Sequence, residues 1–176
     1  MGGEVPVSTS PTYVTDVTEQ FDGSTWTEVA DLNNERIAIV GAGTQAAGLA
    51  ITGGHADGTT DSSTYVESWN GSSWSNGTAT NDQRKYAMGG GTQTSAIVTG
   101  GKVDPAVLDS AETWNGSSWT EITVINTGRY DSGRGATSDS SAIIFGGDIP
   151  SYTGVTEVWN GSTWTEVGDM ATARAA

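Results

Sequence analysis

Hydrophobic and polar positions alternate along this chain in short runs that favour strands. Residues 64–69 alternate with a period of two, which is typical of a strand on a pleated surface. Asn70-Gly71 follows directly and predicts a tight hairpin turn in which both residues take positive φ, with a returning strand from residue 73. The pattern in this stretch therefore predicts a β-hairpin.

The same hairpin occurs four times, with a Glu at its start and a Trp at its end. The four copies span residues 19–26, 67–74, 112–119 and 157–164. Their closing tryptophans (Trp26, Trp74, Trp119, Trp164) are each followed ten residues later by an arginine (Arg36, Arg84, Arg129, Arg174). After the first three arginines an apolar run ends in a glycine pair, at Gly53-Gly54, Gly100-Gly101 and Gly146-Gly147. So many fixed offsets establish an internal repeat.

One repeat contains four predicted strands. A first strand is expected around residues 85–88 and a second over 96–99, before the glycine pair, and the Glu-to-Trp hairpin supplies the third and fourth. Four short antiparallel strands at a period in the mid-forties are what one blade of a β-propeller requires. The repeat therefore predicts an all-β protein with almost no helix.

A glycine pair after an apolar strand, then an aromatic, then a tryptophan resembles the kelch repeat, from about Thr15 to the end. The uniform hairpin spacing departs from the usual motif and is similar to kelch-like repeats of bacteriophage and environmental bacterial proteins. The resemblance implies a kelch-like β-propeller of four-stranded antiparallel blades, about three and a half of them in this chain. The predicted divisions are an N-terminal segment beginning at a Gly-Gly repeat boundary (1–14), a half blade (15–29), two blades (30–77 and 78–122), and a blade plus tail (123–176).

Three and a half blades are too few to close a ring, because propellers usually need four to eight. Either the chain is a segment of a longer protein, or strands of another copy or another protein complete the unfinished blade. The alternative is a compact four-bladed miniature with one half-sized blade.

Composition and charge limit the classes of molecule that this chain can bind. Seven tryptophans and 25 glycines fit a thin sheet core. A net charge of −14, from 21 acidic and 7 basic residues, opposes binding to nucleic acid or to an anionic membrane surface. No run is long and apolar enough for membrane insertion, and the N-terminus does not resemble a signal peptide. We expect a solvated acidic surface.

The residue inventory disfavours catalysis. The chain has one histidine, His55, and no cysteine, which leaves no Cys/His pair and no multi-histidine metal site. A Ser-His-Asp triad of His55 with Asp57 or Asp61 is formally possible but weakly supported, as is a calcium site at these two aspartates. We therefore expect no enzyme activity, no catalytic residue, no metal and no cofactor.

The repeated residues favour structural roles. Each unit carries one Glu and one Arg, which fits a recurring hydrogen-bonded pair better than a functional ring of charge. Four asparagines, Asn70, Asn76, Asn115 and Asn160, match the glycosylation pattern, but turn chemistry explains at least three of them. The triplet at residues 89–91 lacks the features of a phosphate loop, and close backbone packing accounts for it.

The loops between the second and third strands vary in length and content, and in a meander they share one face with the connections between units. Any ligand surface is expected on that face, since rigid scaffolds usually bind through their loops. The candidate ligand-binding residues there are His55, Asp57, Lys102 and Tyr152. The alternative is that these are ordinary solvated loops.

The function expected from these features is a non-enzymatic structural and recognition module. Following the resemblance, it would be a virion appendage or fibre component of a phage that binds other virion proteins, copies of itself or host surface glycans. The alternative is a carbohydrate-binding or adhesion module of a longer bacterial cell-surface protein, located extracellularly. A kelch-containing enzyme is a third, disfavoured possibility.

Overall fold

The chain is an all-β protein. The computed structural model describes residues 3–5, 13–55 and 62–175, and every regular element in those residues is a β-strand. Twelve of the strands form three antiparallel four-stranded sheets, in agreement with the sequence prediction. Sheet I contains β5 (Val40–Thr44), β6 (Ala47–Ile51), β7 (Val66–Trp69) and β8 (Trp74–Asn76). Sheet II contains β9 (Met88–Thr92), β10 (Ser95–Thr99), β13 (Ala111–Trp114) and β14 (Trp119–Ile122). Sheet III contains β15 (Gly133–Ser138), β16 (Ser141–Phe145), β17 (Thr156–Trp159) and β18 (Trp164–Val167).

The remaining strands form two-stranded antiparallel pairs. These are β1 (Gly3–Val5) with β2 (Tyr13–Thr15), β3 (Thr18–Phe21) with β4 (Trp26–Val29), and β11 (Lys102–Val103) with β12 (Ala106–Val107). The β3–β4 pair is the first copy of the repeated hairpin and has no inner strands beside it among the described residues.

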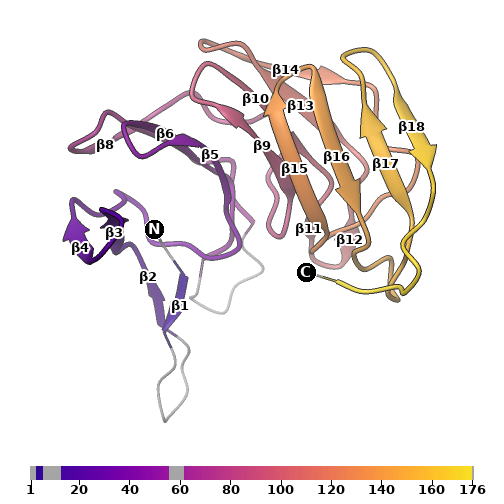
Figure 1. The fold of residues 1–176 in the computed structure, drawn as a ribbon, viewed down its shortest axis with the longest axis horizontal. Coiled ribbons are helices and arrows are strands. Elements are labelled where there is room, and N and C mark those ends of the chain that lie inside the picture. The colour runs from indigo at the N-terminus through magenta and orange to yellow at the C-terminus, as the bar shows by residue number, and fades with distance from the viewer. Residues whose placement is uncertain (1–2, 6–12, 56–61, 176) are drawn as a thin grey trace.

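The three sheets are arranged in an open arc (Figure 1). Their first strands, β5, β9 and β15, lie side by side in that order. The β3–β4 hairpin lies at one end of the arc and sheet III at the other, and no described strand joins the two ends. The described strands thus do not form the compact closed miniature considered above.

The first strand of the repeat lies later than the sequence pattern predicted. It was expected around residues 85–88, whereas β9 runs from Met88 to Thr92. Tyr86 has φ of 55°, which interrupts an extended strand, and the glycine triplet forms the strand in its place. A Cβ at Gly89 or Gly91 would collide with carbonyl oxygens of β10, so close packing explains why glycine stands there.

The prediction for the hairpin turn was wrong in detail. In the turn between β7 and β8 only Gly71 takes positive φ, because Trp69 pairs with Trp74 and leaves a four-residue loop. The Asn70 side chain accepts hydrogen bonds from the backbone N–H groups of the two residues that end this loop, and Asn115 and Asn160 do the same in their copies.

In sheet I the residues equivalent to Gly100-Gly101 are Thr52-Gly53, which lie one residue before the Gly53-Gly54 pair of the sequence. Thr52 and Gly53 have φ of 56° and 113°, close to the 59° and 93° of Gly100 and Gly101 in sheet II. Thr52 therefore occupies a position that glycine occupies in the next repeat. Its hydroxyl donates to the Ile51 carbonyl oxygen at 2.8 Å.

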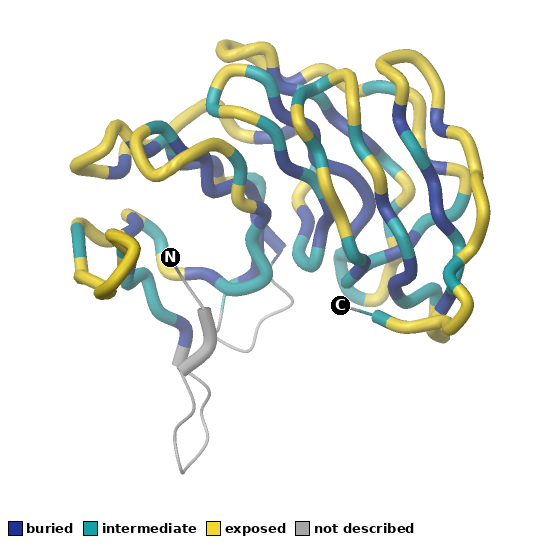
Figure 2. Tube along the Cα trace, in the orientation of Figure 1, coloured by how far each residue is buried: buried dark blue, intermediate teal, exposed yellow. Residues whose placement is uncertain are grey.

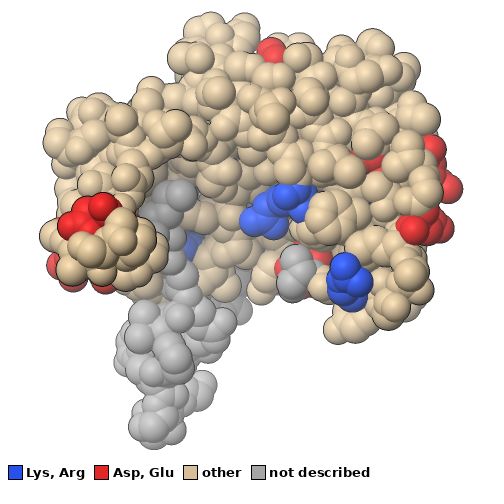
Figure 3. All heavy atoms as spheres, viewed as in Figure 1, with Lys and Arg blue, Asp and Glu red and all other residues tan. Residues whose placement is uncertain are grey.

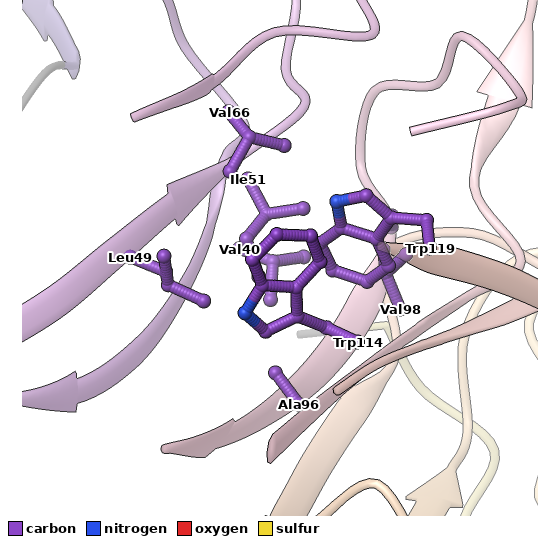
Figure 4. Close-up of a cluster of buried hydrophobic side chains, with 9 residues drawn as sticks. Val40, Leu49, Ile51, Val66, Ala96, Val98, Trp114 and Trp119 are labelled. Atoms are coloured by element: carbon purple, nitrogen blue, oxygen red, sulfur yellow. The ribbon is translucent and has the colours of Figure 1, made fainter. Parts of the chain in front are cut away.

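Tryptophan pairs form the cores between neighbouring sheets. Trp114 and Trp119 of sheet II lie at a centroid distance of 5.3 Å and pack against Val40, Leu49 and Ile51 of sheet I (Figure 4). The pair in sheet III, Trp159 and Trp164, packs in the same way on sheet II, and the pair in sheet I lies beside Val29 of β4. Burial is concentrated along these seams, with exposed turns outside them (Figure 2).

A buried Arg–Glu pair holds each sheet to the connection that precedes it. Arg36 Nη2 lies 3.0 Å from Glu67 Oε1, and Arg84 Nη2 lies 2.7 Å from Glu112 Oε1. Arg129 and Glu157 form the third pair, and all six side chains are fully buried. Each glutamate also accepts backbone N–H bonds from the connection, such as Asn81 N to Glu112 at 2.7 Å. The carboxylate thus fixes both the arginine and the backbone path that leads to it.

Removing one partner of such a pair leaves an uncompensated buried charge. We expect Glu112→Ala to lower the free energy of unfolding by about 3–5 kcal/mol. Glu121 is the matched control, because it faces Glu112 across β13 and β14 but is exposed, and Glu121→Ala should change stability by less than about 0.5 kcal/mol. Urea unfolding followed by tryptophan fluorescence measures both, and equal effects for the two variants would contradict the structural role.

Candidate functional site

The connections between sheets and the loops after the second strands meet on one face of the arc. Antiparallel bridges join them at equivalent positions, namely Ile37 with Gly54, Lys85 with Lys102, and Tyr130 with Asp148. The first residue of each bridge directly follows the buried arginine of its sheet. We call this surface the loop face.

The inner part of the loop face is built from three residues in left-handed conformation. Ala38, Tyr86 and Asp131 have φ of 55°, 55° and 54°, and each lies two residues after its buried arginine. Tyr86 N donates to Ala38 O at 3.3 Å, and Asp131 N donates to Tyr86 O at 3.0 Å. This backbone chain links the sheets and encloses, with Ile39 and Arg134, a hollow of about 280 Å³.

Aromatic and charged side chains from two repeats gather beside this hollow. The Tyr86 and Tyr130 rings lie 6.3 Å apart, and Lys102 Nζ lies 4.9 Å from the centroid of Tyr130. Asp104 bridges two lysines, with its Oδ1 2.6 Å from Lys102 Nζ and its Oδ2 2.6 Å from Lys85 Nζ. We call these five residues the Tyr–Lys cluster.

The ion pairs shift the titration of the cluster. The hydrogen bond from Lys102, and next that from Lys85, holds the pKa of Asp104 below its ordinary value. The same hydrogen bond raises the pKa of Lys102. Interaction with the Asp148 carboxylate raises the pKa of Tyr130, so this phenol stays protonated and able to donate a hydrogen bond.

The charges on the molecule are unevenly distributed. On the side shown in Figure 3, acidic side chains gather near the β3–β4 hairpin and beside β17 and β18, and isolated basic side chains lie nearer the middle. Among the described residues no group of three or more His, Cys, Asp and Glu side chains is arranged to hold a metal ion. The described part of the chain also contains no helix that is long and apolar enough to cross a membrane.

The structure brings together only some of the predicted ligand-binding residues. Lys102 belongs to the Tyr–Lys cluster, whereas His55 lies in a separate shallow hollow with its ring edge-on to Tyr65 at 5.5 Å. Tyr152 is 64% exposed and forms an antiparallel bridge with Asp148. Asp57 and Asp61 lie outside the described residues, so the triad and calcium hypotheses that involve them have no structural account.

Sequence reasoning missed the two tyrosines of the cluster. Tyr86 lies two residues after its repeated arginine, where the first repeat has Ala38. Tyr130 lies one residue after its arginine, where the first repeat has Ile37. An alignment of the three repeats on their arginines would have shown that these positions differ while the arginine is constant. That variation was a usable signal, but the hairpins and glycine pairs drew attention to the scaffold.

The comparisons with known proteins bear on the fold. No protein-family model matches the chain, and no curated protein is a significant match. Among solved structures the chain is similar to that of YjhT, with a TM-score of 0.81 over 99% of this chain and 68% of that one. The sequence identity is 13%, so the likeness shows a shared all-β architecture alone.

The Asp104 titration tests the geometry of the cluster. We expect its pKa, measured by carboxyl NMR, to lie below 3.8 and to move up toward that value in Lys102→Ala, with a smaller shift in Lys85→Ala. Since the folded pKa is the lower one, the stabilisation is present above the unfolded pKa and is lost as pH falls through the folded pKa. Both groups are partly exposed, so solvent screens the effect on global stability. An unmoved titration in Lys102→Ala would contradict the pairing.

Proposed function

We propose that this chain supplies about three and a half blades of a kelch-like β-propeller and serves as a non-enzymatic structural and recognition module that binds its ligand on the loop face. The observation that carries the proposal is the contrast between constant and variable positions in the repeats. The buried arginines, their glutamates and the tryptophans recur, whereas the two positions after each arginine hold Ile37-Ala38, Lys85-Tyr86 and Tyr130-Asp131. A scaffold that repeats its frame and varies one surface is suited to recognition.

The arrangement of the sheets supports the propeller part of the proposal. The first strands lie side by side, each sheet packs its tryptophan pair on the sheet before it, and the backbone chain from Ala38 to Asp131 runs along the inner side. Radial sheets with their first strands innermost are the geometry of propeller blades. Further blades would be needed to complete a ring.

The Tyr–Lys cluster favours a carbohydrate ligand. Two half-buried tyrosines offer ring faces for the apolar side of a sugar, and the phenols, Lys85, Lys102 and Asp104 offer donors and acceptors for its hydroxyls. The net charge of −14 disfavours polyanions, so neutral host surface glycans fit best. By the resemblance of its repeats, we place the module in a phage appendage or fibre, with other virion proteins as partners.

A panel of immobilised neutral oligosaccharides tests this function, with Tyr86→Ala and Tyr130→Ile as the informative variants. Each places at the site the residue that the first repeat has at the equivalent position, so the backbone is already known to accept it. We expect binding that falls at least about tenfold in each variant, equivalent to about 1.4 kcal/mol. Thr165→Ser, exposed on β18, is the control that should bind as the parent does.

Two results would contradict the proposal. Binding that is unchanged in both tyrosine variants would remove the loop face as the site. Chromatography of the oligosaccharide after incubation tests for catalysis. Products of hydrolysis or rearrangement would show an enzyme rather than a recognition module.

A further inference from the structure

The repeated residues have a different environment at the two ends of the arc. Glu67, Glu112 and Glu157 are fully buried, whereas Glu19, at the same position of the first hairpin, is exposed. Their partners Arg36, Arg84 and Arg129 are buried as well, but Arg174, the last of the four repeated arginines, is exposed. Among the described residues neither Glu19 nor Arg174 has an ion-pair partner.

The tryptophans show the same difference. Trp74, Trp119 and Trp164 are 9%, 7% and 6% exposed, whereas Trp26 is 66% exposed and its neighbour Phe21 39%. In sheets II and III the aromatic pair is buried because it packs on the sheet before it. The β3–β4 hairpin has no such sheet within the described residues, so its aromatic pair, 5.1 Å between centroids, faces solvent.

Sheet III presents the complementary surface at the other end of the arc. Leu49, Ile97 and Ile143 are the third residues of their strands β6, β10 and β16. Leu49 and Ile97 are covered by the tryptophans of the next sheet, whereas Ile143 is 38% exposed. The sheet therefore has an apolar face of the kind that accepts an aromatic pair.

The backbone at Arg174 makes the same hydrogen bond to the preceding glycine pair as the connections that lead into sheets II and III. Gly147 N donates to Arg174 O at 2.8 Å, as Gly53 N donates to Arg84 O at 2.9 Å and Gly101 N to Arg129 O at 2.8 Å. The Arg174 backbone thus occupies the position equivalent to that of Arg84 and Arg129, whose side chains pair with the glutamate of the hairpin that follows.

We propose that two copies of this chain associate head to tail, with the β3–β4 hairpin of one copy docked on sheet III of the other. Phe21 and Trp26 would cover Ile143 and Phe145 of the second copy, and Glu19 would pair with its Arg174. The contact continues a seam that the chain builds internally between sheets I and II and between sheets II and III. It joins two different surfaces, so it is a heterologous interface.

Among the described residues β3 has no inner strands beside it, but the contact that the proposal needs does not require them. In every sheet the aromatic pair stands on the third and fourth strands, and β3 and β4 are the equivalents of these two. The hairpin alone therefore carries the aromatic part of the seam together with the glutamate. This inference does not depend on the loop face or on its ligand.

Charge reversal tests the interface. Sedimentation velocity of the 176-residue chain over a range of concentrations should show reversible association for the parent protein. We expect Glu19→Arg and Arg174→Glu each to weaken association at least tenfold, because each places like charges opposite one another. The double variant restores an opposite pair and should return to within about threefold of the parent.

Two further variants complete the design. Trp26→Ser should abolish association, since it removes the largest exposed aromatic of the hairpin, and Glu121→Arg, the same charge change on exposed β14, should have no effect. Circular dichroism verifies that each monomer is folded. A parent chain that is monomeric at every concentration, single reversals without effect, or a double variant that stays dissociated would each overturn the proposal.

Discussion

The buried Arg–Glu pair is the constraint on which the rest of the structure depends. Taking both charges out of water is costly, and hydrogen bonds to the two groups offset that cost. Glu112 accepts from Arg84 and from the backbone of residues 81 and 82, whereas Nε of Arg84 has no hydrogen-bond partner among the described residues. The pair therefore fixes the connection before a sheet to the third strand of that sheet.

The same pair also positions the loop face. The two residues after each buried arginine form the bridge to the neighbouring loop and the left-handed corner beside the hollow. Because Arg84 and Arg129 are fully buried and ion-paired, they position Tyr86 and Tyr130 beside each other although these belong to different repeats. A frame held by buried charges can thus vary the residues beside it at little structural cost.

Much of the fold could be predicted from the sequence because it rests on local chemistry that is repeated. The hairpins, the four-stranded antiparallel units and the absence of helix among the described residues follow from alternation, Asn-Gly turns and glycine pairs. The start of β9 could not be predicted, because the left-handed Tyr86 extends the connection before the strand in a way that propensity does not show. The left-handed conformation of Thr52 was not predicted, because β-branched residues rarely adopt positive φ.

The candidate site was less predictable than the fold. Lys102 was predicted from loop composition, but its partners Asp104 and Tyr130 come from its own loop and from the next connection. Tyr130 reaches Lys102 from a different repeat, and a single sequence contains no signal for a contact of that kind. His55 was selected for the chemistry of its side chain, but the fold places its ring against Tyr65 and not in the Tyr–Lys cluster.

The net charge determines which interactions can hold two copies of the chain together at the ends of the arc. A chain of charge −14 repels its own copies at long range, so a contact between copies needs a short-range attraction. The exposed rings of Phe21 and Trp26 can supply it, because burying apolar area does not depend on charge. One pair between Glu19 and Arg174 adds little affinity in water but excludes other registers, since a misplaced carboxylate would meet an acidic surface. Aromatic burial would then determine how strongly copies associate, and the charge pair would determine where.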